Sequence, residues 1–474
     1  MADFAQALLH GVGIPGILVH SDLVQISLLQ KSAVPAVAAV AAAVVLAAPA
    51  RAAGPFPLLE RIANLVEREY IDPVDAAKLE AGAIDGLLAA AAATADAPVY
   101  KARIDASRRF VAVAQAAGTL RDRRLASVDA VPDQALEFGA IKGMLATLDD
   151  PYTRFLEPAA FRAMNDDRQG SYAGIGVQVG IVERQLTVIA PFDDSPGQRA
   201  GLRGGDRILE IDGQPSLDLP VEVAVSRIRG PAGTEVGLKV RRAGKADPIE
   251  IKVTRATIVT RPVKTRQLAG NVGYVRLATF YNEAADTDMQ KALEELREKT
   301  ALVLDLRGNP GGLLPKAVNI GTMFIESGPI VQVVDRKGRR ELLPDNPDKP
   351  RATFWPKTRR LVVLVDGGSA SAAEILSGAL KDAKLATLVG TRTFGKGVVQ
   401  TIHALDGGGG VAITTDRYLT PGGAYINKVG IQPDIVVEQP KPKDPQIMPT
   451  LDERIDAGTD AQLNAALALI KKAR

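Results

Sequence analysis

Apolar residues recur at helical spacing in the first part of the chain. Each amphipathic segment of this kind predicts a helix. The predicted helices are Phe56–Tyr70, Val74–Ala93, Val99–Ala117 and Asp133–Thr147. Two of them contain related octapeptides, AGAIDGLL at 81–88 and FGAIKGML at 138–145. The region 53–168 is therefore predicted to be helical.

The pattern changes at about 169–258 to short strands separated by glycine turns. The segment SYAGIGVQV predicts a glycine loop that leads into a strand. A short helix, a strand, an Asp-Gly turn and an amphipathic helix follow, and VGLKVRR and EIKVTRA then predict a closing hairpin. Together these elements predict a small β-domain.

The segment 259–440 alternates strands of the buried type with helices. Apolar, β-branched runs predict strands at 272–278, 301–306, 361–366, 411–419 and 430–437. Helices are predicted at 284–299, 314–327 and 371–380, and the polar stretch 335–357 is predicted to be a surface excursion. A linker rich in proline and lysine then precedes a last helix at 460–472. The strand–helix–strand order predicts α/β organisation.

Composition narrows the functional classes. The chain has 474 residues, which suggests about three domains. Its 58 Lys and Arg residues nearly balance 55 Asp and Glu residues, so the net charge of +3 gives no reason to expect nucleic-acid binding. The absence of cysteine from the sequence excludes disulfides, thiol catalysis and cysteine-ligated metals.

The N-terminal residues predict export. Lys31 precedes the apolar run Ser32–Ala50, and Ala50-Arg51-Ala52 fits the small-x-small pattern of a signal-peptide cleavage site. The alternative is an uncleaved membrane anchor, because the run approaches the length that spans a bilayer. In both cases the remaining chain is expected in the periplasm or cell envelope.

The segment 366–400 contains three residues that could form one reactive unit. Ser371 is predicted to begin a helix, where unpaired N–H groups attract developing negative charge, so it is suited to attack a carbonyl. Lys396 can act as its base if burial keeps the amine neutral. The Gln400 amide can orient that amine. The apolar wall around the lysine is predicted to come from Phe394, Val398 and Val399.

Ser371 and Lys396 each have an alternative interpretation. Ser371-Ala372-Ala373-Glu374 fits a capping box, which needs no chemistry. The run GTRTFGK at 390–396 matches the start of a phosphate-binding P-loop. Gly397 stands where that motif needs Ser or Thr, and the following residues predict a strand instead of a helix.

The small number of histidines in the sequence disfavours a histidine-based triad. The sequence has His10 and His20, which precede the predicted cleavage site, and His403, which lies in a strand-like run with no special surroundings. A serine hydrolase with this sequence would therefore need another base, and lysine serves in known variants of the triad.

GSASAAEILSGAL followed by VGTRTFGKGVVQ resembles the motifs of the carboxyl-terminal processing, or tail-specific, proteases of peptidase family S41. The resemblance runs from about Phe56 to Val437. It implies a serine endopeptidase with Ser371 as nucleophile, Lys396 as base and Gln400 as the orienting residue. RGNPGG at 307–312 resembles the family's oxyanion turn, with an ordinary Pro-Gly turn as the alternative. The implied oxyanion donors are Ala372 and either Gly311 or Gly312.

The β-domain resembles a PDZ domain, which binds a peptide C-terminus as an added strand and holds its carboxylate on backbone N–H groups. The resemblance implies a carboxylate-binding loop at Ala173–Gly176 and a peptide-pairing strand at Ile175–Val179. A β-domain used only as a spacer is the alternative. Arg229 corresponds to an arginine that the family links to substrate sensing. The peptide-binding residues implied by the resemblance are Ala173, Gly174, Ile175, Gly176, Val177 and Arg229.

The resemblance implies a multidomain α/β (α+β) fold with an α/β core of the ClpP/crotonase-like type. The expected parts are a leader or anchor (1–52), a helical region (53–168), a PDZ domain (169–258), a peptidase core (259–440) and a linker with a C-terminal helix (441–474). The family usually has a single copy of the repeated octapeptide. The insertion near 90–135 is therefore either an extra helical hairpin or part of a dimerisation element.

The predicted function is cleavage of proteins near a C-terminus that the PDZ domain has captured, with no cofactor and no metal. The alternative is an inactive PDZ scaffold that presents exported proteins to a partner protease. The expected partners are proteins or peptides with a free C-terminus and no nucleic acid. An adaptor protein, a membrane and a second copy of the chain stay open as partners.

The leader generates the first testable prediction. Because Ala50-Arg51-Ala52 fits a cleavage site, N-terminal sequencing of protein from the cell-envelope fraction should give Ala53 as the first residue. Recovery of Lys31–Ala52 on protein from a membrane pellet would show that the run is an anchor.

Overall fold

The computed structural model of this 474-residue chain describes residues 56–91, 101, 110–124, 132–182, 184–192, 195–219, 221–259, 261–344, 346, 348–440 and 451–472. The predicted leader 1–52 lies outside these residues, as does most of the first half of the helix predicted at 99–117. Within the described ranges, no helix is long and apolar enough to cross a membrane.

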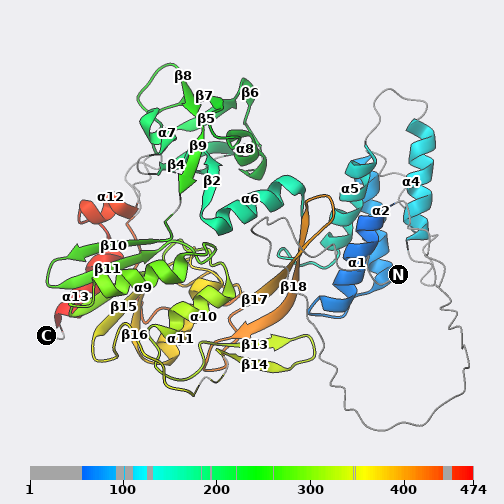
Figure 1. Ribbon diagram of the computed structural model, residues 1–474. Coiled ribbons are helices and arrows are strands. Elements are labelled where there is room, and N and C mark those ends of the chain that lie inside the picture. Colours follow the sequence, from blue (N-terminus) through cyan, green and yellow to red (C-terminus); the bar gives the residue numbers. More distant parts are fainter. Residues whose placement is uncertain are drawn as a thin grey trace, which may run out of the picture. The chain divides into compact units, whose positions relative to one another are not determined.

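Helices α1, α2, α4 and α5 form the N-terminal region (Figure 1). Their bounds are Pro57–Glu69, Ala76–Ala90, Val111–Arg124 and Asp133–Ala146. Leu59, Ile84 and Leu136 from this region share one buried core with Val411 and Ile413, which come from strand β18 near the other end of the chain. The N-terminal helices therefore pack on the rest of the protein instead of forming a closed bundle.

The helix predicted at 99–117 needs correction at its C-terminal end. Helix α4 continues through Gly118 to Arg124. A glycine inside a helix costs only about 1 kcal/mol relative to alanine. The buried residues Val113, Ala117 and Leu120 lie in the same core as α2, and this packing outweighs the glycine.

The repeated octapeptides pack against one another. A Cβ atom added to Gly86 of α2 would lie 2.1 Å from the Gly139 carbonyl oxygen of α5, and one added to Gly143 would lie 2.2 Å from the Gly82 carbonyl oxygen. The two helices therefore approach so closely that neither can carry a side chain at the crossing. This explains the echo between 81–88 and 138–145, because each copy provides the glycine surface that the other needs.

The β-domain contains a five-stranded antiparallel path in the order β3-β4-β5-β7-β8, with β6 paired to β5. The strands are β3 (Val177–Val182), β4 (Gln185–Pro191), β5 (Arg207–Ile211), β6 (Gln214–Pro215), β7 (Glu235–Arg241) and β8 (Ile249–Thr254), and the helices are α7 (Pro196–Arg199) and α8 (Val221–Ile228). Strands β2 (Ser171–Gly174) and β9 (Ala256–Val259) form a separate two-stranded ribbon. Strand β3 is thus an edge strand.

The strand predicted at Ile175–Val179 begins two residues later. Ala173 and Gly174 belong to β2, and Ile175 and Gly176 form the turn that leads into β3. Gly176 has φ +68°, a left-handed conformation that glycine adopts at little cost, so the chain turns there before the strand starts.

A six-stranded sheet in the order β10-β11-β12-β15-β16-β19 forms the centre of the remaining chain. Strand β10 pairs antiparallel to β11, and the other neighbours are parallel. The strands are β10 (Val263–Leu268), β11 (Val272–Leu277), β12 (Ala301–Asp305), β15 (Arg360–Val365), β16 (Ala386–Gly390) and β19 (Ile435–Val436).

Alternate residues of these strands belong to two different cores. Helices α9 (Ala285–Glu295), α10 (Leu314–Thr322) and α11 (Ala372–Asp382) cover one face (Figure 1). Helix α13 (Ala461–Lys472) covers the other and follows α12 (Leu451–Asp456). The α/β organisation predicted from the strand–helix alternation is therefore confirmed.

A second, antiparallel sheet lies beside the helices, with strands β1 (Arg154–Leu156), β13 (Val331–Asp335), β14 (Arg340–Leu343), β17 (Val398–Ala404) and β18 (Gly410–Leu419). Helix α6 (Pro158–Gln169) connects β1 to β2. The polar stretch 335–357 thus contains strand β14, which is exposed and lies at a sheet edge, where polar residues are normal.

Two other predicted bounds are wrong. The strand predicted at 430–437 shrinks to the two residues of β19, because Gly430 and Pro433 interrupt it. Helix α10 ends at Thr322 instead of 327.

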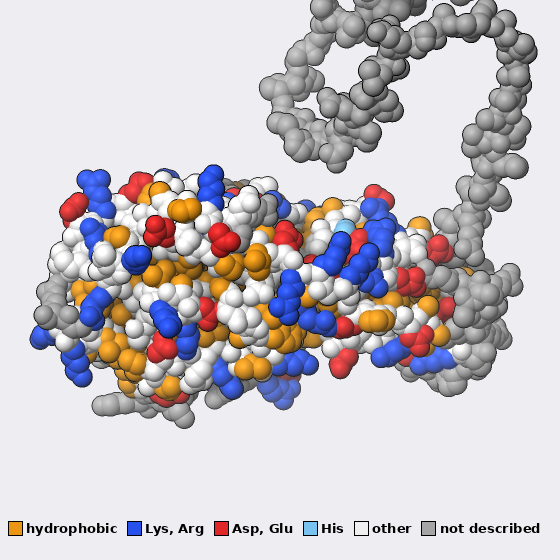
Figure 2. All heavy atoms as spheres, turned by 90° about the horizontal axis from the view of Figure 1, so that it is seen from below, with side chains coloured by type: hydrophobic (Ala, Val, Ile, Leu, Met, Phe, Trp, Pro, Cys, Tyr) orange, Lys and Arg blue, Asp and Glu red, His pale blue; other side chains and the backbone are white. Residues whose placement is uncertain are grey.

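The net charge of +3 is the small difference between many positive and many negative side chains. On the face shown in Figure 2, Lys and Arg side chains lie among Asp, Glu and hydrophobic side chains.

Candidate active site

Ser371 lies where strand β15 turns into helix α11, as predicted. It is the N-cap residue of α11, with φ 53° and ψ −116°. A non-glycine residue in such a conformation is strained and persists only where its surroundings hold it. The N–H of Ala370, the preceding residue, donates to the Asn309 carbonyl at 2.9 Å. The loop after β12 therefore helps to hold the serine in this turn.

The carboxylate of Glu374 joins the Ser371 turn to the loop that carries Lys396. Its Oε2 accepts the N–H of Ser371 at 2.8 Å and the N–H of Lys396 at 2.9 Å. Its Oε1 accepts the Thr393 hydroxyl at 2.6 Å and the Gly395 N–H at 2.7 Å. Glu374 is fully buried. Burial raises the pKa of this carboxyl, and the four donated hydrogen bonds offset part of that rise.

Lys396 is half-buried beside an aromatic ring from the N-terminal region. Its Nζ lies 4.7 Å from the ring centroid of Tyr152, in the segment before β1. Burial lowers the pKa of Lys396, and the positive charge of Arg154 lowers it further. Asp150 and Glu374 act in the opposite direction without reversing the shift. The amine is therefore easier to deprotonate than an ordinary lysine.

Tyr418 of β18 links the same two loops at their carbonyls. Its hydroxyl lies 3.1 Å from the Ser371 carbonyl oxygen and also donates to the Lys396 carbonyl oxygen. Burial raises the pKa of Tyr418 well above its ordinary value, so the phenol keeps its proton and acts as a donor.

The RGNPGG loop approaches Ser371. A Cβ atom added to Gly311 would lie 2.8 Å from Ser371 Cβ and 2.9 Å from the Ala372 nitrogen. The Gly311 N–H already donates to Asn309 Oδ1 at 2.9 Å. Gly312 has φ +147° and packs against the backbone of Phe280, where a Cβ would lie 2.2 Å from the Phe280 carbonyl carbon. The structure thus brings Gly311 next to Ser371 and Ala372, whereas Gly312 packs on the Phe280 backbone.

Gln400 is not joined to Lys396 by a hydrogen bond among the described contacts. Its Nε2 donates to Thr414 Oγ1 at 3.2 Å across the β17–β18 pair, where the register shifts between Val399 and Gln400. The structure therefore places Gln400 on β17, with its amide nitrogen directed to Thr414 of β18.

The prediction of an apolar wall around the lysine is wrong for Phe394, and it did not include Tyr152. The Phe394 side chain is 57% exposed, whereas Val398 is buried. The aromatic cover comes from Tyr152 instead.

His403 has a partner that the sequence did not reveal. Its Nε2 lies 2.6 Å from the Glu69 carboxylate at the end of α1. This pair connects β17 to the N-terminal helices.

The predicted peptide-binding residues of the β-domain lie together beside the edge strand β3. The carbonyl oxygen of Ile175 accepts the Gly197 N–H at 2.7 Å, and that of Gly176 accepts the Phe192 N–H at 2.9 Å. The guanidinium of Arg229 lies 4.2 Å from the ring centroid of Tyr172 on β2. The turn before β3 is thereby held in one conformation, with Arg229 packed nearby.

The comparisons with known proteins match this chain over its core. The model of peptidase family S41 matches residues 271–437, and the model of a PDZ domain matches residues 188–242. A carboxy-terminal-processing protease of Bartonella bacilliformis is 39% identical over 317 residues, which cover 66% of this chain and 71% of that protein. A carboxyl-terminal-processing protease of Synechocystis is 40% identical over 343 residues, which cover 71% of this chain and 78% of that protein.

The chain belongs to peptidase family S41.

A solved structure of a photosystem II D1 C-terminal processing protease agrees with this assignment. It aligns with 83% of this chain and 95% of its own, with a TM-score of 0.52 and 30% sequence identity. The predictions of a serine peptidase and of a multidomain α/β fold with a PDZ domain are therefore confirmed.

Sequence reasoning missed the residues that surround the lysine of this S41 peptidase. Asp150, Tyr152 and Arg154 all lie in LDDPYTRFL, which follows the second octapeptide. Its two adjacent aspartates and a proline in an otherwise helical and apolar region were the available signal. Nothing in the spacing connected that segment to Lys396.

The four hydrogen bonds to Glu374 generate a prediction about stability. Glu374→Gln keeps one acceptor oxygen and turns an amide toward two of the four donors. Each buried donor left without an acceptor costs about 1–3 kcal/mol, so we expect a loss of about 2–6 kcal/mol. A lower urea midpoint and loss of peptide cleavage should result. Glu341→Gln on the exposed strand β14 is the matched control. Equal midpoints for the two variants would contradict the bridging role.

Proposed function

We propose that this S41 peptidase cleaves protein substrates near their C-termini, with Ser371 as nucleophile and Lys396 as general base. The observation that carries the proposal is the Glu374 carboxylate, which accepts the N–H groups of both residues. A helix cap alone would need only the bond to Ser371. The additional bond to Lys396 fixes the position of the lysine loop relative to the serine turn.

In the proposed mechanism, Ser371 attacks the scissile carbonyl while neutral Lys396 takes the hydroxyl proton. The protonated lysine then returns a proton to the leaving amine, and water hydrolyses the acyl-enzyme by the same steps. Burial and the charge of Arg154 favour this role, because both lower the lysine pKa. Gln400 is proposed to orient the amine through its side-chain oxygen, since its Nε2 is engaged by Thr414.

The oxyanion is proposed to be held by the N–H groups of Ala372 and Gly312. Ala372 is the first residue of α11, where backbone donors point out of the helix end. Between the two glycines of the predicted turn, Gly312 is favoured, because the Gly311 N–H is engaged by Asn309. The role proposed for Gly311 is to let the loop approach Ser371 closely, because there is no room for a side chain at this position.

The PDZ domain is proposed to capture the free C-terminus of the substrate. Strand β3 lies at the edge of its sheet, so its outer backbone groups can pair with an added strand. The segment Ala173–Gly176, which runs from the end of β2 through the turn, would hold the terminal carboxylate, and Val177 would begin the pairing. Arg229 lies beside this turn through its contact with Tyr172. Export to the cell envelope, directed by residues 1–52, belongs to the same proposal.

Carboxylate capture generates a prediction about substrate tails. A peptide with a free C-terminus should bind about ten- to a hundredfold more tightly than its C-terminal amide, because charge-assisted hydrogen bonds of this type contribute about 1.5–3 kcal/mol. Isothermal titration with the Ser371→Ala protein measures this without cleavage. Equal affinities would remove the PDZ domain from tail recognition.

The lysine base generates a prediction about pH. The neutral fraction of Lys396 grows as the pH rises through its pKa, so kcat/KM should rise along one limb that lies below the range of an ordinary lysine. Lys396→Arg should be inactive, because guanidinium does not lose its proton in proteins. His403→Ala should keep the limb. Cleavage by the arginine variant would show that the base is misassigned.

Two neighbouring charges should move that limb in opposite directions. Arg154→Met removes a positive charge that lowers the pKa of Lys396, so its limb should move to higher pH. Asp150→Asn removes a negative charge that raises the pKa, so its limb should move to lower pH. Shifts in the same direction would contradict the assignment of this limb to Lys396. If the unmodified protein binds peptides but cleaves none at any pH, the alternative of an inactive PDZ scaffold would be favoured.

A further inference from the structure

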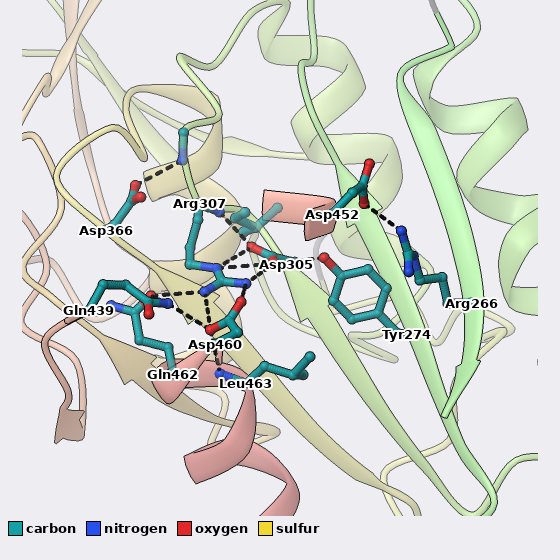
Figure 3. Close-up of polar contacts among 12 residues, drawn as sticks. Arg266, Tyr274, Asp305, Arg307, Asp366, Gln439, Asp452, Asp460, Gln462 and Leu463 are labelled. Atoms are coloured by element: carbon teal, nitrogen blue, oxygen red, sulfur yellow. Dashed lines mark hydrogen bonds and ion pairs between the residues drawn. The ribbon is translucent and has the colours of Figure 1, made fainter. Parts of the chain in front are cut away.

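Arg307 is a buried cation at the root of the loop that approaches the nucleophile. It follows strand β12 and is only 4% exposed. Its Nε donates to both carboxylate oxygens of Asp305, at 2.9 and 3.1 Å. Asp305 also accepts the Tyr274 hydroxyl at 2.8 Å (Figure 3). Nη2 of Arg307 also donates to Asp305 Oδ2, at 2.5 Å, so Asp305 occupies the whole Nε edge of the guanidinium.

The C-terminal segment supplies the other side. Nη1 and Nη2 of Arg307 donate to the two oxygens of Asp460, each at 2.8 Å, and Nη1 also donates to Gln462 Oε1 at 3.0 Å (Figure 3). Asp460 is buried, and burial raises its pKa. The hydrogen bonds and the charge of Arg307 outweigh that effect and lower the pKa. The guanidinium is thus held between two carboxylates from distant parts of the chain.

Asp460 is also joined to its own helix and to the segment before it. Its Oδ1 accepts the Leu463 N–H at 3.0 Å at the start of α13, and it accepts Gln439 Nε2 at 2.6 Å. Leu463, Ala466 and Ile470 attach the helix to the central sheet by apolar contact. Apolar burial holds α13 on the sheet. The hydrogen bonds of Asp460 to Leu463 and Gln439 orient its carboxylate toward Arg307.

The peptide after Arg307 leads directly to the proposed oxyanion turn. The Gly308 N–H donates to the Asp366 carboxylate at 2.8 Å, and Gly308 has φ +65°. Asn309 then accepts the Ala370 N–H and orients Gly311. The loop is short, and Gly308, Asn309 and Gly311 each make a hydrogen bond in it, so displacement of the Arg307 side chain would be transmitted to Gly311 beside Ser371.

We propose that Asp460 is a positioning residue of the peptidase site: it holds Arg307 in place and thereby sets the Gly308–Gly312 loop for transition-state stabilisation. The helix α13, which begins after it, lies outside residues 271–437 that match the S41 model. The inference rests on the proposed role of the loop in holding the oxyanion. It makes the C-terminal segment part of the catalytic unit of the full chain.

The test uses two full-length variants that differ in what they disturb. Asp460→Asn can keep Oδ1 for the helix cap and for Gln439, but places an amide against Arg307 Nη2. Leu463→Ala weakens the apolar docking of α13 without removing a partner of Arg307. Steady-state cleavage of a tail peptide gives kcat and KM, and thermal midpoints report the structural effect of each variant. Hydrogen exchange of the peptide covering residues 307–313 reports the loop directly.

Asp460→Asn should lower kcat about 10- to 100-fold with KM changed less than about twofold, because loss of a whole oxyanion donor costs about 10²–10³ and acts on the transition state. Exchange at 307–313 should become faster. Leu463→Ala should keep kcat within about threefold and leave that exchange unchanged, even with a lower thermal midpoint.

Several results would overturn the inference. A normal kcat or unchanged loop exchange in Asp460→Asn would do so, and so would losses of kcat that follow the thermal midpoint equally in both variants. The exchange measurement needs no turnover. If the unmodified protein fails to cleave any tail peptide, the proposed function fails while the exchange data still decide whether Asp460 holds the loop.

Discussion

The carboxylate of Glu374 is the contact on which the site geometry depends. One buried side chain accepts hydrogen bonds from the turn that carries Ser371 and from the loop that carries Lys396. Because it is fully buried, each oxygen must be satisfied by protein donors, and four are present. The strained φ of Ser371 is tolerated because these bonds, together with the Ala370–Asn309 bond, hold the turn from several sides.

The parallel sheet explains why the second loop arrives at the same place. Strands β12 and β15 are neighbours and run in the same direction, so their carboxyl ends open on one edge. The loops that follow them therefore meet, and the Asp366 carboxylate accepts N–H groups from both, at Gly308 and Gly368. Binding sites of α/β sheets commonly form outside the carboxyl ends of parallel strands, for the same geometric reason.

Local patterns predicted much of this arrangement, and distant contacts supplied what they could not. The strand–turn–helix around Ser371 follows from an apolar run, two glycines and a serine, which are neighbours in sequence. The S–A–A–E pattern correctly pointed to a bond between Glu374 and Ser371, but its bonds at Gly395 and Lys396 depend on how separate loops fold back. The cover of Lys396 by Tyr152 joins residues 244 positions apart, and no periodicity encodes such a pairing. Likewise, the pattern before α13 predicted a helix start, but not that Asp460 would meet Arg307.

The shared core of the N-terminal helices and strand β18 has a consequence for biosynthesis. Ribosomes make the chain from its N-terminus, so helices α1, α2 and α5 exist before Val411 and Ile413 are available to cover them. The same delay separates Tyr152 from Lys396. Arg154, whose charge lowers the pKa of Lys396, is also made long before the lysine, so the surroundings that shift this pKa are complete only when these distant segments have met. The environment of Lys396 is therefore a property of the completed fold and not of the sequence segment that carries the lysine.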